Sequence, residues 1–464
     1  MWTKFLNLWK TSHEEATFSA RRWRRIFQAA GAGAAGRIIS ITCSLVQIPI
    51  ALRHLGSDSF GLWITLTSMV TLVNFADLGM GLGLQNLISR AHGKDAPHEL
   101  NLAFRTGFLV LTGISALLLL GGLPIISHLD WAVLLNIHNS VLALDAKSSA
   151  MVVAIAFCVG IPLMTFQRVA TGLQLGWLTS ATACLGSILS LLFVLIASFL
   201  NMRLVAFITM VVLAPLLANI VLALMLRTHV RLFSSQERFF DSRMIRPLFK
   251  SGLMFLVPQI GATLMNAVPV VVLSAVCGPA AVTPYSLAQR IVGLASQAAS
   301  MVLTPLWPAY AEAYVRGDVD WIKKTFRLSI LAVVLGLPLP CLAFWLHGET
   351  LIRLWSSYQG ELGFWFLGAM AAWLAVTTAG LVCAMFLNGL GRLRGQAIYG
   401  SLFVGCAILL LRPITEQIGM VGVPLTMTIC YVIINLSCAT IECFRVYRNL
   451  SGPVKFRFNS APAL

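Results

Sequence analysis

Residues 204–226 read LVAFITMVVLAPLLANIVLALML, and residues 227–250 continue as RTHVRLFSSQERFFDSRMIRPLFK. The first stretch carries no charged side chain and exceeds the roughly 20 residues that a helix needs to cross about 30 Å of hydrocarbon. The second stretch is polar and rich in arginine. Apolar runs of this kind recur along the chain and are continuous, so they predict transmembrane helices and not alternating barrel strands.

The composition supports an integral membrane protein. Among the 464 residues, 58% are hydrophobic and only 11% are charged, whereas soluble domains contain about 25% charged residues. An all-α membrane protein with about 12 transmembrane helices is therefore expected. The expected spans are 28–52, 60–84, 106–127, 149–168, 178–200, 204–226, 251–276, 283–306, 328–346, 362–387, 397–411 and 421–442.

The net charge is +16, and the distribution of the basic residues along the chain indicates the orientation in the membrane. With a cytoplasmic N-terminus, the inner segments hold about 26 of the 33 Lys and Arg residues, which is the positive-inside bias of multi-pass membrane proteins. Both termini are then cytoplasmic. Because the basic residues follow topology and attract anionic lipid, we expect membrane lipids as partners and no nucleic acid.

The basic stretch 227–250 separates six spans from six more. Short motifs also recur: Gly93-Lys94-Asp95 resembles Arg316-Gly317-Asp318, and Gly172-Leu173 resembles Gly389-Leu390. These repeats predict two six-helix bundles related by a parallel pseudo-two-fold axis along the membrane normal. The expected domains are a basic amphipathic segment (1–27), an N-terminal bundle (28–226), a cytoplasmic linker (227–250), a C-terminal bundle (251–443) and a cytoplasmic tail (444–464).

Polar side chains gather on one face of four expected spans, and these spans are equivalent pairs under the repeat. Such residues are costly in lipid, so they indicate either a shared substrate cavity or contacts that hold helices together. The faces comprise Arg37, Ser40, Ser44 and Gln47; Asn74, Asp77, Gly81 and Gln85; Gln259, Thr263 and Asn266; and Gln289, Arg290, Gly293, Gln297 and Ser300.

Arg37 and Arg290 are the two basic residues expected deep within spans. Their forked guanidinium groups suit a diphosphate. Asp77 lies at a depth similar to that of Arg37, so the two side chains could equally form a structural ion pair. In the functional interpretation, Asp77 either tempers Arg37 or takes up a coupling proton or cation.

The other motifs in the sequence do not indicate a soluble enzyme. Gly31, Gly33 and Gly36 match G-x-G-x-x-G, but a basic segment precedes them and a span contains them, so close helix packing is the better interpretation. No nucleophile elbow, P-loop or HExxH motif occurs, and the histidines lack metal-ligand spacing. We therefore expect no enzyme, no cofactor and no metal. The ten cysteines lie in or beside spans, so no disulfide framework is indicated.

Further motifs carry a family resemblance. These are Leu55-Gly56, Phe60-Gly61-Leu62-Trp63, Asp77-Leu78-Gly79 and Gly389-Leu390-Gly391-Arg392, together with Gly93 and Asp95. With the twelve-span plan, the chain resembles the polysaccharide-transport (Wzx-type flippase) branch of the multidrug/oligosaccharidyl-lipid/polysaccharide (MOP) exporter superfamily.

The resemblance implies a flippase that moves a polyprenyl-diphosphate-linked oligosaccharide across the bacterial inner membrane by ion-coupled alternating access. The product would feed O-antigen, exopolysaccharide or capsule synthesis, with polymerase and chain-length proteins as possible partners. Alternatives are a cation-coupled multidrug exporter, a membrane-embedded glycan polymerase or ligase, and a non-transporting scaffold. The predicted cavity residues are Arg37, Arg290, Gln47, Asn74, Gln259, Asn266, Gln289 and Gln297, with Asp77 as the ion-coupling candidate.

Overall fold

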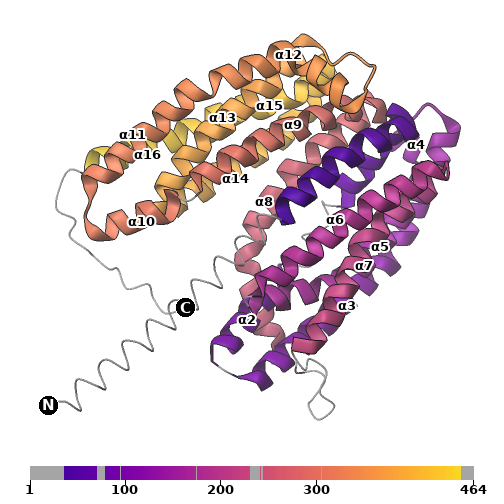
Figure 1. Cartoon of the computed structure of the whole chain (residues 1–464), viewed down its shortest axis with the longest axis horizontal. Helices are drawn as coiled ribbons and strands as arrows, with labels where there is room; N and C mark the ends of the chain where they lie inside the picture. Colours follow the sequence, from indigo (N-terminus) through magenta and orange to yellow (C-terminus); the bar gives the residue numbers. More distant parts are fainter. Residues whose placement is uncertain are drawn as a thin grey trace. The chain divides into compact units, whose positions relative to one another are not determined.

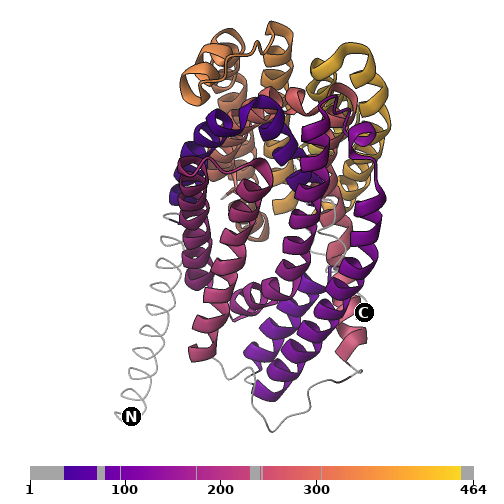
Figure 2. The same cartoon turned by 90° about the vertical axis from the view of Figure 1, so that its right-hand side faces the viewer.

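The described part of the chain consists of helices joined by short turns, and Figures 1 and 2 show them from two directions. No strand occurs among the described residues, and the all-α fold class is confirmed. The structure is a computed structural model. It describes residues 36–70, 79–94, 96–173, 175–229, 241, 244–304 and 306–450.

The helices follow one another with few intervening residues. In the first half they are Gly36–Val70, α2 (Met80–Gly93), α3 (Pro97–His128), α4 (Trp131–Leu134), α5 (Ser140–Gly172), α6 (Gly176–Phe199) and α7 (Leu204–His229). In the second half they are α8 (Ile245–Cys277), α9 (Pro279–Leu303), α10 (Leu306–Arg316), α11 (Val319–Gly336), α12 (Pro338–Ser356), α13 (Phe364–Gly389), α14 (Leu393–Ile418), a 3₁₀ turn (Gly419–Val421), α15 (Gly422–Cys430), a π-helical segment (Tyr431–Leu436) and α16 (Ser437–Asn449).

Eight helical stretches among the described residues are long and apolar enough to cross a membrane. The expected span 204–226 lies within α7. The expected span 328–346 lies within the apolar stretch Val319–Ser356, in which α11 ends at Gly336 and α12 begins at Pro338. Proline has no backbone N–H to donate and is favoured in the first turn of a helix, so it starts a new one here.

The chain forms two compact units, each described separately. The first comprises residues up to 56, 73–130 and 141–259, and the second comprises residues 57–72, 131–140 and 260 onward. The chain passes between the units at Gly56, whose φ of 75° is readily adopted only by glycine. The expected bundle limits, 28–226 and 251–443, remain predictions.

In the second unit, the start of α9 is held by segment 57–72. The backbone carbonyl of Pro279 lies so close to Gly61 that a Cβ there would be 1.8 Å from its oxygen. The Thr283 hydroxyl donates a hydrogen bond to the Ser57 carbonyl at 2.7 Å, and the neighbouring Phe60 side chain is buried. Glycine at 61 is therefore required for this close packing of backbone on backbone.

The two units contain matching cores. Ile88 and Phe104 belong to the core of the first unit, and Tyr310 and Phe326 belong to that of the second. Tyr310 lies 222 residues after Ile88 (310 minus 88), and Phe326 lies 222 residues after Phe104 (326 minus 104). The two cores thus use corresponding positions of the two sequence halves, as expected for an internal repeat.

A glycine contact occurs in both cores. Gly172, at the end of α5, packs on α2, where a Cβ would lie 2.8 Å from the Ile88 side chain and 2.9 Å from the Gln85 carbonyl oxygen. Gly389, at the end of α13, packs on α10, where a Cβ would lie 2.4 Å from Tyr310 Cβ. Both glycines belong to the Gly-Leu motif that recurs in the sequence. The motif therefore marks a close helix contact that each half needs.

We expect Gly389→Ala to destabilise the protein by about 1–3 kcal/mol, the usual cost of overpacking a filled core. The matched control is Gly405→Ala in α14, because a Cβ at Gly405 meets no atom within 4 Å and alanine favours a helix by up to about 1 kcal/mol over glycine. Thermal unfolding of the detergent-purified proteins measures both. Equal unfolding temperatures for Gly389→Ala and the wild type would contradict the close contact.

Candidate functional site

The nine predicted site residues are only partly described by the structure. Asn74 and Asp77 lie outside the described residues, as does the side chain of Gln259. The predicted Arg37–Asp77 pair therefore remains a prediction. Of the six others, Arg37 and Gln47 belong to the first unit, whereas Asn266, Gln289, Arg290 and Gln297 belong to the second.

In the first unit, the polar face of helix Gly36–Val70 contacts α6. The Ser187 hydroxyl donates to Ser40 Oγ at 2.8 Å, and the Ser190 hydroxyl donates to Gln47 Oε1 at 3.2 Å. These contacts link the two helices, which is the packing role considered for single polar residues in spans. Gln47 thus has a structural partner, and its role in substrate binding stays a prediction.

Arg37 is placed differently from Gln47. Its side chain is exposed, and it forms no hydrogen bond or ion pair with the part of the chain that the structure describes. Gly36 beside it packs close to α6, where a Cβ would lie 3.2 Å from the Ser180 carbonyl oxygen. The helix is therefore held next to α6 while the guanidinium group extends away from the core.

In the second unit, α9 presents a polar face. Arg290 and Gln297 are both exposed and lie seven residues apart, so they share one side of the helix. Gly293 lies between them, and a Cβ there would meet no atom within 4 Å. The opposite side carries the buried Tyr285 and Val292. This face is therefore accessible and polar, and its centre has no bulky side chain.

The position of Arg290 within α9 determines how much free energy its charge would cost in a lipid bilayer. It lies near the middle of α9, whose 25 residues run from Pro279 to Leu303. A charged side chain at the centre of a transmembrane helix costs about 2.5–3.5 kcal/mol when it inserts into lipid. An accessible arginine at this position is therefore better explained by water or by a polar cargo than by hydrocarbon.

The remaining two predicted residues lie on α8 and α9. Asn266 on α8 is exposed, and Gln289 on α9 is half-buried. Among the described residues, no group of three His, Cys, Asp or Glu side chains could hold a metal ion. The described polar surface of the second unit thus offers amide and guanidinium donors, which suit anions and sugar hydroxyls.

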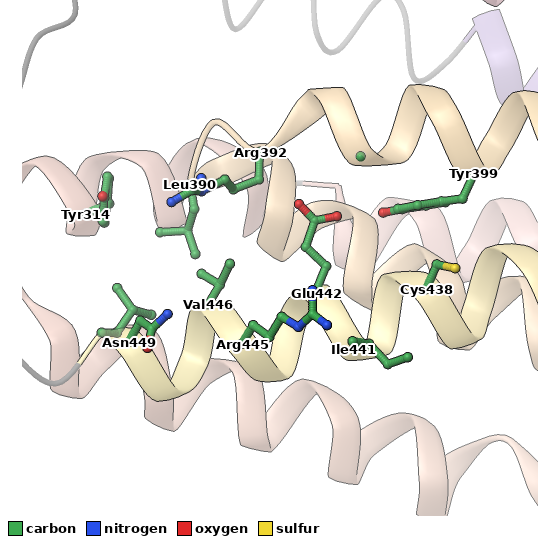
Figure 3. Close-up of a pocket in the computed structure, with 12 residues that line it drawn as sticks. Tyr314, Leu390, Arg392, Tyr399, Cys438, Ile441, Glu442, Arg445, Val446 and Asn449 are labelled. Carbon is green, nitrogen blue, oxygen red and sulfur yellow. The ribbon is translucent and has the colours of Figure 1, made fainter.

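The sequence did not single out a pocket of about 590 Å³ in the second unit (Figure 3). Three charged residues, Arg392, Glu442 and Arg445, contribute to its lining. Two signals could have indicated it. Arg392 ends the Gly389-Leu390-Gly391-Arg392 motif, and Glu442 and Arg445 are three residues apart, which places them on one face of a helix.

Comparisons with known proteins agree with this architecture. The family described as "Polysaccharide biosynthesis protein" matches residues 28–313. A relative named "Putative O-antigen transporter" from Salmonella typhimurium is 22% identical over 303 residues, which cover 65% of this chain and 69% of the relative.

Two solved structures share the fold. An inward-facing multidrug resistance MATE family transporter of the MOP superfamily has a TM-score of 0.71 at 14% identity and covers 89% of this chain and 94% of its own. The lipid II flippase MurJ, in an inward closed conformation, has a TM-score of 0.65 at 12% identity and covers 92% and 90%, respectively.

At such low identities, the structural likeness by itself shows a common fold. The family match, in contrast, spans more than half of the sequence and includes the Leu55-Gly56 and Asp77-Leu78-Gly79 motifs. It confirms the resemblance seen in the sequence. The chain is a multi-pass membrane protein that belongs to the polysaccharide biosynthesis protein family.

Proposed function

We propose that this protein is a flippase that moves a polyprenyl-diphosphate-linked oligosaccharide from the inner to the outer leaflet of the bacterial inner membrane. Family membership supports a role in polysaccharide synthesis, and the likeness to a putative O-antigen transporter supports transport. The observation that carries the proposal is the polar face of α9, where the exposed Arg290 and Gln297 flank the open position at Gly293.

The chemistry of this face suits the head of such a lipid. A guanidinium group forms two parallel hydrogen bonds to phosphate oxygens, so Arg290 would bind the diphosphate. Gln297, two turns away, can donate to and accept from sugar hydroxyls. Arg37 supplies a second accessible guanidinium from the first unit. Alternating access would carry the cargo across, with Asp77 as the candidate for ion coupling.

An anionic cargo is favoured over the alternatives. A cation-coupled multidrug exporter would need carboxylates facing its cargo, whereas the described face of α9 presents an arginine. A polymerase or ligase would need a clustered set of catalytic side chains, and the predicted outer segments are short. Polymerase and chain-length proteins are proposed as partners that consume the flipped lipid.

Arg290→Ala should lower flipping about 10- to 100-fold, because it removes charge-assisted hydrogen bonds that contribute about 1.5–3 kcal/mol. The assay uses proteoliposomes that contain a fluorescent polyprenyl-diphosphate sugar, and a membrane-impermeant reductant reports its leaflet. Arg290→Lys should keep part of the activity. The matched control is Arg353→Ala, because Arg353 pairs with Glu349 in an exposed bridge at 2.6 Å and such pairs contribute little.

If the Arg290→Ala variant flipped the lipid at the wild-type rate, the proposed role of Arg290 in diphosphate binding would be wrong. Surface polysaccharide in a strain that carries only the variant gives a second readout, and immunoblotting controls for protein level. Transport of a cationic dye in place of the labelled lipid would instead support the multidrug exporter.

The proposed orientation is tested by reporter fusions. Green fluorescent protein fused after Leu450 should fluoresce, and alkaline phosphatase at the same position should be inactive, because the positive-inside bias places this end in the cytoplasm. Phosphatase inserted after Ser357, which follows α12, should be active. The reverse pattern at both positions would show that the orientation is wrong.

A further inference from the structure

A pocket of about 590 Å³ lies at one end of the second unit, outside the predicted cavity residues (Figure 3). Its lining comes from the end of α10, from the turn between α13 and α14, from α14 and from α16. The lining residues are Tyr314, Leu390, Arg392, Gly395, Tyr399, Cys438, Ile441, Glu442, Arg445, Val446, Asn449 and Leu450.

Two cations and one anion line this pocket. Arg392 comes from the turn before α14, while Glu442 and Arg445 come from α16 (Figure 3). No ion pair joins either guanidinium group to a described carboxylate. The charged lining side chains therefore sum to one positive charge, and both arginines have hydrogen-bond donors to offer to a ligand.

A buried hydroxyl also points into the pocket. Tyr399 is only 8% exposed, and its ring extends from α14 toward the Glu442 carboxylate (Figure 3). Its hydroxyl interacts with the Glu442 carboxylate. The phenol and the carboxylate therefore form one polar group in the lining of the pocket.

The carboxylate of Glu442 lies against the backbone of α14. A Cβ at Gly395 would be 2.3 Å from Glu442 Oε2, so the carboxylate occupies space that a larger side chain at this position would take. A carboxylate repels a bare phosphate, but it accepts hydrogen bonds from hydroxyl groups. The pocket thus combines donors for phosphate with an acceptor for a hydroxyl.

The surface beside the pocket is apolar. The lining residue Ile441 is 52% exposed, and on the same two helices Ile398 and Phe444 are 64% and 65% exposed. The positive-inside bias places this end of the unit at the cytoplasmic surface, at the level of lipid headgroups. Basic pockets between transmembrane helices at this level bind anionic lipid headgroups.

We propose that this pocket binds an anionic phospholipid with a hydroxylated headgroup, of the phosphatidylglycerol class, from the inner leaflet. Arg392 and Arg445 bind the phosphodiester, and the headgroup hydroxyls donate to the Glu442 carboxylate. The acyl chains lie on the apolar surface of α14 and α16. The single net positive charge of the pocket matches the single negative charge of this lipid. The site is separate from the proposed transport face.

Cys438 provides a direct test, because it lines the pocket and is the exposed one of the ten cysteines. The full-length protein is placed in nanodiscs of phosphatidylcholine alone or with phosphatidylglycerol. The rate of Cys438 alkylation by the uncharged reagent N-ethylmaleimide is then followed by mass spectrometry. We expect phosphatidylglycerol to slow alkylation at least several-fold.

The double variant Arg392→Gln/Arg445→Gln should lose this protection. Its matched control is Arg353→Gln/Arg412→Gln, which removes the same charge from two exposed ion pairs. This control should retain the protection by phosphatidylglycerol. Phosphatidylmethanol has the same charge without headgroup hydroxyls, so it should protect the wild type less than phosphatidylglycerol does.

Equal alkylation rates in the two wild-type nanodiscs would overturn the proposal even if the double variant failed to fold. Persistent protection in a folded double variant would overturn the role of the arginines, and equal protection by phosphatidylmethanol would overturn the role of the headgroup hydroxyls. Protection by inorganic phosphate alone in phosphatidylcholine nanodiscs would show a soluble anion site and exclude the lipid. None of these outcomes depends on flipping, so the proposal and the proposed function can fail independently.

Discussion

The structure depends on one constraint, which is that backbone N–H and C=O groups in hydrocarbon must be hydrogen-bonded within the protein. A helix satisfies them locally, so long apolar runs such as α7 become helices whatever their neighbours are. In lipid, helices then associate through close packing more than through the hydrophobic effect. This is why Gly172 and Gly389, each of which allows two helices to pack closely, recur in both halves of the chain.

The same constraint gives polar side chains two distinct uses. Gln47 lies on a helix face that hydrogen-bonds to α6, and there it contributes to the packing of two helices. Arg290 and Gln297 lie on an accessible face of α9, where water, a polar ligand or other protein groups can stabilise a charge. Identical spacing along a helix therefore corresponds to different roles, depending on which element packs against that face.

Polar side chains have a third use in the charged pocket near the end of α16, where they line a binding site. There the guanidinium groups of Arg392 and Arg445, the carboxylate of Glu442 and the hydroxyl of Tyr399 come from two helices and a turn. The sequence alone relates the basic residues to orientation and to a general attraction of anionic lipid, without a binding site. Both roles are compatible, because an excess of basic residues on the cytoplasmic side also places cations beside anionic headgroups.

The sequence by itself determined the helical class, the positions of most spans and the family, because these depend on local hydropathy, on charge and on short motifs such as Gly389-Leu390. It also indicated that Arg290 is unusual, since a charge inside an apolar run can be seen without a structure. Only the tertiary structure decided that Gln47 has a partner on α6, that Arg290 is accessible, and that Arg392, Glu442 and Tyr399 line one pocket. Those properties depend on which helices pack together, and a linear pattern of polar residues has the same period whether its face meets a neighbour, lipid or water.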